Sequence, residues 1–400
     1  MRRIILILAS VLAFSSCDLL APDEVENPNV EADDFATSPQ AMKVWLNGVN
    51  ANFAVCVAKF AEFTGLMSDD LMNNSSRSSK TYDQLDIHYT DGEVSSLSTH
   101  VGKMLQMTAF GLNTIALNDA ETTPAQLFNL HYVRAYAYLL AGENFVALPK
   151  EARGEVLEGD GLLTLAMSEL ETAKAFASTG SDQALILLLQ ARAARGLGRM
   201  ADAADYAQRS LSASTEMLVS VKYDALNGFS NSLHEYIASN LFSILERMQF
   251  LSAKFPMTEL WNQSLPIAKS EEAYLILAEA AVHEGRLAVA QEILLQLLDL
   301  VDVRPSAVSL TSVTPAWITA QTDRRSLLEA VYLLRQEIFF GEGRRASDMG
   351  IRLPISEVEY NEQGNLPVRY TEAFIPAYLQ PIRTEIDLHQ DLNRLIVESL

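Results

Sequence analysis

The sequence predicts a mainly α-helical protein, in which tetratricopeptide-like helical hairpins are followed by an irregular C-terminal region. Three observations support this fold class. Apolar residues recur at helical spacing over most of the range 96–300, whereas the alternating pattern of a half-buried strand is almost absent. A hairpin-like segment also occurs twice. The composition is that of a globular chain, since 49% of the 400 residues are hydrophobic and 20% are charged.

The balance of charges excludes some classes of partner. The chain carries 30 Lys and Arg against 51 Asp and Glu, which gives a net charge of −21. Binding to nucleic acid or to anionic lipid needs clustered cations, so we expect neither as the main partner. The two cysteines, Cys17 and Cys56, provide neither a disulfide framework nor a metal site with several thiolate ligands.

The N-terminus has the features of a signal peptide. Two arginines precede an apolar run over residues 4–14. Such a run forms about 16 Å of helix, roughly half the thickness of a bilayer core. Small residues then precede Cys17, as in a bacterial lipobox, in which the cysteine becomes the first residue of the mature chain and carries the lipid. We expect residues 1–16 to be a lipoprotein signal peptide and acyl chains such as palmitate on Cys17 to provide a membrane anchor. An ordinary secretory signal that contains a cysteine is the alternative.

An acidic tether is expected to join this anchor to the folded part. Residues 18–39 contain seven acidic residues and three prolines with little periodicity, so we assign residues 17–39 to the tether. Helical patterning begins near Pro39, and Cys56 lies within it as an apolar, inert thiol. A polar surface loop is expected over 73–80, extending to about Glu93.

One internal repeat explains the tetratricopeptide-like prediction. The segments Leu185–Leu211 and Tyr274–Leu298 carry small residues and a Gly-Arg pair at a constant offset of 87 residues. Small residues let two antiparallel helices approach closely, and the glycine ends the first helix at its C-terminal cap. Leu130–Phe145 resembles a third, weaker copy. A hairpin array provides a scaffold and a concave face, but the repeat pattern does not identify a ligand.

The last hundred residues, 301–400, form a different subregion. We expect a connecting loop over 301–316 and a helix over Asp323–Phe340 with one apolar face. The chain from Arg352 to Leu379 contains three prolines and is expected to be irregular, and the chain closes with a short polar end.

Motifs for catalysis are missing from the sequence. It contains no Gly-rich phosphate loop and no Gly-x-Ser-x-Gly elbow. No two histidines are spaced i, i+4 for a helical zinc site. We therefore expect no enzyme activity, no metal and no cofactor, although paired carboxylates of a glycosidase meet only in space and leave no motif. The scattered histidines are His88, His100, His131, His234, His283 and His389.

Two polar clusters have alternative interpretations. Asp69 and Asp70 are the best candidates for a cation site or a helix cap, but a solvated loop start is favoured, because two adjacent carboxylates do not complete an oxygen cage. Arg344, Arg345 and Asp348 follow a helix end, where a structural salt-bridge cluster is favoured over an anion site.

Aromatic residues near helix breaks are candidates for ligand contact. Aromatic rings stack on the apolar faces of sugars and are otherwise poor choices for an exposed surface. An aromatic residue at a helix end is more often part of the core edge. The residues in or beside such breaks are Tyr223, Tyr236, Trp261 and Trp317.

Several segments, in order, resemble the SusD/RagB family of outer-membrane lipoproteins. The lipobox, the acidic tether and the Ser-Asp-Asp at 68–70 are similar to the start of that family. The later segments with this resemblance are Tyr132–Leu139, Ala147–Pro149, Ala273–Ala290, Glu342–Met349 and Pro381–Ile386. The chain departs from the family pattern at Ile338, where a glutamate is common, and at Arg383, where a proline is common. It is also short for the family, and residues 217–261 look trimmed.

The resemblance implies a nutrient-binding lipoprotein without catalysis. It implies a single SusD-like helical domain over residues 40–400, on an outer membrane and facing the cell exterior. There the protein would act as the lid of a SusC-like TonB-dependent transporter and bind a nutrient, commonly a glycan. A helical-repeat scaffold lipoprotein of an envelope complex is the alternative, and a lipid-anchored glycosidase is a third reading. Relatives tend to carry ligand-binding aromatics in the early loop and the trimmed stretch. From their positions in loops and helix breaks, we expect ligand contacts among Tyr82, Tyr89, Tyr223, Tyr236 and Trp261.

Overall fold

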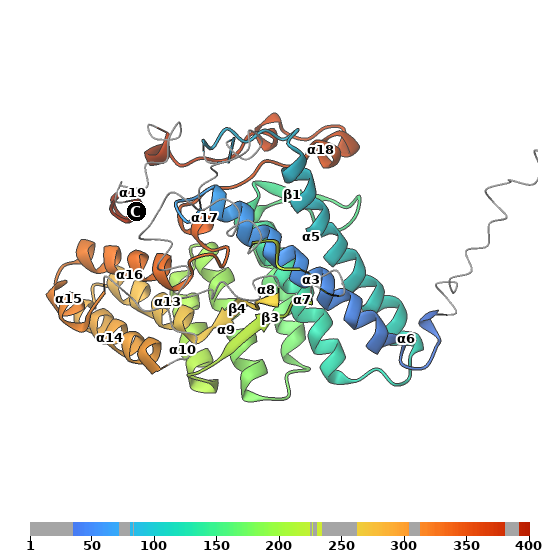
Figure 1. The fold of residues 1–400 in the computed structure, drawn as a ribbon, viewed down its shortest axis with the longest axis horizontal. Coiled ribbons are helices and arrows are strands. Elements are labelled where there is room, and N and C mark those ends of the chain that lie inside the picture. The colour runs from blue at the N-terminus through green and yellow to red at the C-terminus, as the bar shows by residue number, and fades with distance from the viewer. Residues whose placement is uncertain are drawn as a thin grey trace, which may run out of the picture.

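The fold is mainly helical, as expected from the sequence. A computed structural model describes residues 35–71, 81–82, 84–224, 226, 230–233, 262–303, 313–380 and 392–400. The helices of eight or more residues are α3 Ala41–Leu66, α5 Gly92–Phe110, α7 Pro124–Asn144, α8 Gly159–Lys174, α9 Gly180–Gly196, α10 Met200–Ala213, α13 Ser270–His283, α14 Leu287–Val303, α16 Arg324–Ile338 and α19 Leu392–Ser399. They pack as an extended array (Figure 1).

Short elements connect these helices. A π-helical turn, Gly111–Ile115, joins α5 to α6 Ala116–Asn118. Two antiparallel sheets of two strands each pair β1 Ala147–Pro149 with β2 Val156–Glu158, and β3 Leu218–Val221 with β4 Leu265–Lys269. The remaining elements are α15 Pro315–Ala320, α17 Arg345–Asp348, α18 Glu357–Gln363 and the 3₁₀ turns Val368–Thr371 and Ala377–Leu379. Strands therefore contribute little to the described fold.

Some sequence predictions lie outside the described residues. These are the signal peptide 1–16, the lipid site Cys17, most of the tether, the loop 73–80, Tyr236, Trp261 and the tail Pro381–Ile386. The end of the predicted tether is described and packs against the domain, because Ala36 is buried and the Phe35 ring lies 6.2 Å from the Trp45 ring.

The two repeat hairpins are confirmed. Helices α9 and α10 form the first hairpin, and α13 and α14 form the second. Gly198, in the turn between α9 and α10, has φ 70°, and Gly285, in the turn between α13 and α14, has φ 75°. In each turn the residue after the glycine donates its N–H to a carbonyl five residues earlier, as in a Schellman cap (2.9 and 2.8 Å). Glycine is favoured at both turns because left-handed backbone strains other residues.

The third, weaker copy forms a hairpin of a different kind. Helices α7 and α8 pack closely, but the strands β1 and β2 separate them along the chain. Gly142 lies inside α7, and a Cβ there would come 2.8 Å from the carbonyl oxygen of Gly159 and 2.7 Å from Leu163. The glycine of this copy therefore allows two helices to touch, and it does not make the turn.

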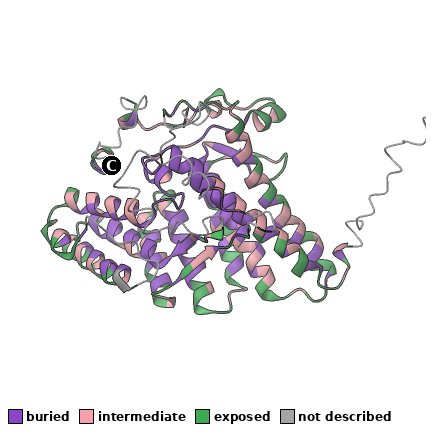
Figure 2. Cartoon of the chain, in the orientation of Figure 1, coloured by how far each residue is buried: buried purple, intermediate pink, exposed green. Residues whose placement is uncertain are grey.

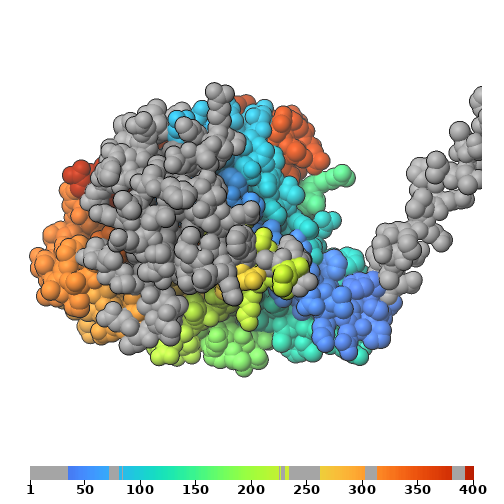
Figure 3. All heavy atoms as spheres, in the orientation of Figure 1, coloured from blue at the N-terminus to red at the C-terminus, as the bar shows by residue number. Residues whose placement is uncertain are grey.

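The core surrounds α3, which crosses the middle of the array (Figures 1 and 2). Large side chains of this helix, such as Phe53 and Phe60, are almost fully buried. Cys56 is also buried, as predicted, and burial raises the pKa of its thiol, which keeps it protonated and inert. Figure 3 shows the outer surface of the array, with the orange residues of the second repeat at one end and the blue residues of α3 at the other.

The C-terminal subregion is partly as expected. Helix α16 follows Asp323, whose carboxylate accepts a hydrogen bond from the N–H of Ser326 (3.0 Å), and residues 350–380 are irregular, as predicted. The short polar end is a wrong prediction. The final residues form α19, which buries Leu392, Ile396 and Val397 and packs against α16. Eight residues are too few for a clear periodic signal, and tertiary packing stabilises this helix.

Candidate functional site

A groove of about 940 Å³ lies between the repeat hairpins and the C-terminal subregion. One side is formed by the ends of α7, α9 and α13 and the beginning of α8. The other side is formed by residues 347–352 and 369–378, with part of α16 and α19. We call the buried ion pairs beneath this space the floor network. We call the segment 369–378, together with Arg352, the wall.

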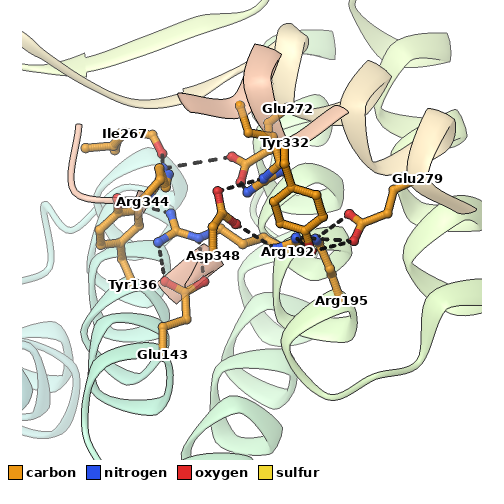
Figure 4. A network of polar contacts seen from close by, with 11 residues as sticks. Tyr136, Glu143, Arg192, Arg195, Ile267, Glu272, Glu279, Tyr332, Arg344 and Asp348 are labelled. Carbon is orange, nitrogen blue, oxygen red and sulfur yellow. Dashed lines mark hydrogen bonds and ion pairs between the residues drawn. The ribbon is translucent and has the colours of Figure 1, made fainter. Parts of the chain in front are cut away.

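The floor network balances four arginines against four carboxylates. Figure 4 shows the two groups converging from α7, α9, α13, α16 and α17. Buried charges need partners because they lose their hydration, and this network provides them. Its members are Arg192, Arg195, Arg335, Arg344, Glu143, Glu272, Glu279 and Asp348, together with the hydroxyls of Tyr136 and Tyr332.

Arg195 connects the network to the groove. Its guanidinium group donates to Glu279 (2.6 Å) and to Asp348 (3.0 Å). The Tyr332 hydroxyl donates to the same Glu279 carboxylate (3.2 Å). All four residues line the groove, so its floor is a set of charges that already satisfy one another.

Asp348 is the point where two arginines meet. Arg335 donates to one oxygen of its carboxylate (2.8 Å) and Arg195 to the other. Burial by itself would raise the pKa of Asp348, but the guanidinium groups of Arg335 and Arg195 outweigh burial and hold this pKa below its ordinary value. Asp348 is therefore a charged structural group.

The deeper half of the network is built around Tyr136. Its hydroxyl accepts a hydrogen bond from Arg344 (3.2 Å), and its ring lies 5.5 Å from the guanidinium carbon of Arg192. Arg192 donates to both oxygens of Glu143. Arg344 also donates to the backbone carbonyl of Ile267 (2.6 Å) in the middle of β4. These bonds join α7, α9 and β4 to the start of α17.

The contacts of the segment Glu342–Asp348 explain why its sequence combines a glycine with charged residues. Glu342 pairs with Lys269 (2.6 Å), and Gly343 has φ 72° and passes against the backbone of Ala61 in α3. Arg344 and Asp348 enter the floor network. Arg345 donates to Asp69 (2.6 and 2.9 Å). The predicted salt-bridge cluster of Arg344, Arg345 and Asp348 is thus confirmed, and it lies in the interior of the protein.

The solvated interpretation of Asp69 and Asp70 is wrong. Both side chains are buried. Asp69 accepts hydrogen bonds from Arg345 and from Gln336 (2.7 Å), while Asp70 accepts one from the N–H of Gly341 (3.3 Å). Their partners come from more than 260 residues further along the chain, which is why local sequence gave no sign of them.

The repeat places three network members at related positions. Arg192 and Glu279 are 87 residues apart, and each stands between two alanines. Tyr136 in α7 also stands between two alanines. Small neighbours let the helices approach, so the central side chain of each triplet points to where the hairpins meet. A polar residue flanked by alanines in every copy was the signal that sequence reasoning missed.

The wall presents a different kind of chemistry. Arg352 and Phe374 face each other in an antiparallel bridge with two hydrogen bonds (Arg352 N–H to Phe374, 3.0 Å; the reverse, 2.8 Å). Directly opposed residues in such a bridge extend to the same side. Both line the groove, and the Phe374 side chain is 54% exposed. The guanidinium group of Arg352 lies against Gly159 and has no hydrogen bond or ion pair within the described residues.

A second polar group stands beside this pair. Arg369 donates to Glu158 (2.6 Å), and the Tyr370 hydroxyl donates to the same carboxylate oxygen (2.8 Å). These hydrogen bonds lower the pKa of Glu158. The wall therefore combines an exposed ring, an unpaired cation and an ionised carboxylate, which can bind a ligand that has both apolar faces and polar edges.

The predicted aromatic residues do not gather at this groove. Tyr82 and Tyr223 are buried, and the Tyr223 hydroxyl donates to the carbonyl of Ala54 (2.9 Å), so both have core positions. Tyr89 is half-buried with its ring 5.7 Å from that of Tyr360. Trp317 is half-buried in α15. Ligand contact by Tyr89, Tyr236 or Trp261 stays a prediction.

Arg352, Tyr370 and Phe374 were absent from the sequence candidates. They lie in the irregular stretch after α17, where no periodic pattern marks which side chains are exposed. The pairing of Arg352 with Phe374 spans 22 residues and depends on tertiary structure.

Metal-type clusters and membrane-spanning helices are both absent from the described ranges. No cluster of three or more His, Cys, Asp or Glu side chains there is arranged to hold a metal ion. Among the same residues, no helix has both the length and the apolar character needed to cross a membrane.

Comparison with known proteins identifies the fold. Neither a family model nor the sequence of a curated protein matches the chain. A SusD superfamily protein from Bacteroides fragilis superposes with a TM-score of 0.59 at 18% identity, covering 82% of this chain and 99% of the other. A SusD-like carbohydrate binding protein from Bacteroides vulgatus gives 0.57 at 14% identity, covering 77% and 83%. A SusD superfamily protein from Bacteroides thetaiotaomicron gives 0.56 at 13% identity, covering 78% and 89%.

Proposed function

The chain has the SusD-like fold, and we propose on this basis that it is a glycan-binding protein whose ligand lies in the groove. The fold agrees with the resemblance of the sequence. One structural neighbour is described as a carbohydrate binding protein, which supports a sugar as the ligand class for this chain too. Fold alone does not define function, so the proposal depends on the chemistry of the wall.

The observation that carries the proposal is the exposed ring of Phe374 beside the unpaired guanidinium group of Arg352. A pyranose ring has an apolar face of C–H groups, which stacks on an aromatic ring, and an edge of hydroxyls, which accept hydrogen bonds from a guanidinium group. Because the backbone bridge fixes Arg352 opposite Phe374, the two contacts are arranged in advance of binding.

The proposal also covers the cellular role. We propose that Cys17 carries the lipid anchor, that the protein lies on the outer membrane facing the cell exterior, and that it acts as the lid of a SusC-like TonB-dependent transporter. The lipobox and the acidic tether support the anchor. The SusD-like fold supports the transporter as partner. No covalent chemistry is required of such a protein.

Glycan binding is tested by titrating the protein with oligosaccharides of known composition. We expect a glycan to bind with modest affinity, and Phe374→Ala to weaken this binding without unfolding the protein. Failure of every glycan in a broad panel to bind would contradict the proposed ligand class. Hydrolysis of a bound glycan would instead favour the glycosidase reading.

The transporter is tested by a pull-down in mild detergent from native membranes. We expect recovery of a stoichiometric partner of transporter size, lost when Cys17 is replaced by serine. Recovery of the bait alone, or with periplasmic proteins only, would favour a scaffold of an envelope complex. The two experiments are independent, so the role at the membrane and the ligand class can fail separately.

A further inference from the structure

Resting on the proposed glycan binding, we propose that the groove selects its ligand by charge. It accepts uncharged or amino-substituted sugars, and it rejects sugars that carry uronate, sulfate or phosphate groups. The inference comes from the charged side chains that line the groove and from which of them are already paired.

Acidic side chains outnumber basic ones around the groove. Six carboxylates line it, against three guanidinium groups and one histidine. The carboxylates belong to Glu143, Glu158, Asp160, Glu279, Asp348 and Glu372, and the guanidinium groups to Arg195, Arg352 and Arg369.

Pairing leaves an acidic surplus where a ligand would enter. Arg195 is held by Glu279 and Asp348, and Arg369 is held by Glu158. The exposed carboxylates of Asp160 and Glu372 have no ion pair among the described residues, so together they outnumber the one unpaired cation, Arg352.

Hydrogen bonding also favours uncharged or amino sugars over acidic ones. An ionised carboxylate only accepts hydrogen bonds, so it needs a partner that donates. Hydroxyl and ammonium groups of a sugar donate, whereas carboxylate and sulfate groups only accept. An acidic sugar would therefore place acceptors against the carboxylates of Asp160 and Glu372 and leave these carboxylates without donors. The selectivity comes mainly from this penalty on acidic sugars and less from a gain for uncharged or amino sugars.

The net charge of the whole chain also disfavours acidic sugars. A net charge of −21 repels anions at long range and slows their approach. This long-range part is screened by salt, with a Debye length of about 8 Å at physiological ionic strength. The local part, in a partly enclosed groove, is screened less.

A thiol introduced into the groove measures its potential without knowledge of the glycan. Ser347 lines the groove and is half-buried, so we choose Ser347→Cys, with Ser168→Cys on the exposed surface of α8 as the matched control. The unsubstituted chain gives the background from its own thiols. Each variant is treated with a cationic and an anionic methanethiosulfonate reagent of similar size.

We expect the ratio of cationic to anionic reaction rates to be about fivefold higher at Ser347→Cys than at the control in low salt. Neutralising the surplus with Asp160→Asn and Glu372→Gln should bring the ratio towards that of the control. An equal ratio at both positions, or a preference for the anionic reagent in the groove, would overturn the proposal.

Glycans with matched backbones test selectivity directly. Suitable pairs are methyl-esterified against free oligogalacturonides, and glucosamine against N-acetylglucosamine oligomers. We expect the methyl-esterified member of the first pair and the glucosamine member of the second to bind more tightly wherever the backbone binds. The Asp160→Asn, Glu372→Gln variant should reduce both differences. Equal or tighter binding of the acidic member would overturn the charge selectivity and leave glycan binding intact. Absence of binding by every glycan would overturn the proposed function itself.

Discussion

The floor network and the wall of the groove use the same residue types in opposite ways. In the floor, Arg195 and Asp348 are held by partners on other helices, and their charges are satisfied within the protein. In the wall, Arg352 has no described partner and Phe374 is half exposed. A charged side chain near a cavity therefore indicates ligand binding only when its own pairing is incomplete.

This difference separates stability from binding. Removing one partner from a buried ion pair leaves the other uncompensated and destabilises the fold. Removing the exposed Phe374 side chain from the wall leaves the fold intact and changes only what the groove can hold. Substitutions in the two regions should therefore change different measurements.

The largest expected effect is in the floor. Asp348→Ala leaves the buried guanidinium groups of Arg335 and Arg195 without their shared carboxylate. We expect the free energy of unfolding to fall by about 3–5 kcal/mol, measured by urea denaturation. The exposed pair of Asp205 and Arg209 in α10 is the matched control, because the same loss of one carboxylate there should cost less than about 0.5 kcal/mol. Similar losses at the two positions would contradict the comparison.

The charge of Asp348 also predicts a dependence on pH. Its pKa is lowered in the folded state, so the folded protein binds fewer protons than the unfolded chain once the pH falls to the unfolded pKa of about 3.9. Its contribution is complete above that pH and is lost as the pH falls through the folded pKa. We expect the stability difference between the protein and Asp348→Asn to shrink below about pH 4 in urea titrations. A difference that stays constant from pH 7 to pH 3 would show that Asp348 is not held ionised.

A smaller effect is expected at the wall. Phe374→Ala removes the exposed ring and should weaken glycan binding about tenfold, or about 1.4 kcal/mol, by loss of stacking. Stability should change by less than about 0.5 kcal/mol because the ring is 54% exposed. Leu117→Ala is the control, since Leu117 is 78% exposed and lies outside the groove, and it should change neither measurement. A large loss of stability in Phe374→Ala would assign the ring to the core.

The smallest effect is expected from the cation beside that ring. Arg352→Gln keeps a hydrogen-bond donor and removes the charge, so binding of an uncharged glycan should weaken by about threefold. Stability should change little, because the guanidinium group has no described hydrogen bond or ion pair to lose and only attracts the Glu158 carboxylate through its charge. Isothermal titration of both variants on one glycan measures this difference. If Arg352→Gln weakened binding more than Phe374→Ala, hydrogen bonding would dominate over stacking in the wall.

The helical part of the fold could be predicted because its signals are local. The Gly-Arg turns after α9 and α13 and the apolar face of α16 depend on residues a few positions apart. The helix α19 was missed because its three buried apolar residues span only one turn and a half and need α16 to cover them.

The candidate site could be predicted only in part. The ion pair of Arg345 with Asp69 spans 276 residues, and the hydrogen bond from Arg344 to the Ile267 carbonyl in β4 spans 77, so neither has a local sequence signal, although the cluster itself was expected. Burial of Tyr82 and Tyr223 could not be read from their positions near helix breaks, because a break often leads into the core. The pair of Arg352 and Phe374 exists only because an irregular segment folds back on itself.

The alanine-flanked positions of the repeat have a consequence for how such a protein can evolve. Tyr136, Arg192 and Glu279 occupy related places in successive hairpins, yet each gives a different chemical group to one shared network. The hairpins are therefore alike in shape but are not interchangeable modules. Duplicating the hairpin of Arg192 or that of Glu279 would add an unmatched charge to the interior, and exchanging these two hairpins would separate Arg192 and Glu279 from their partners.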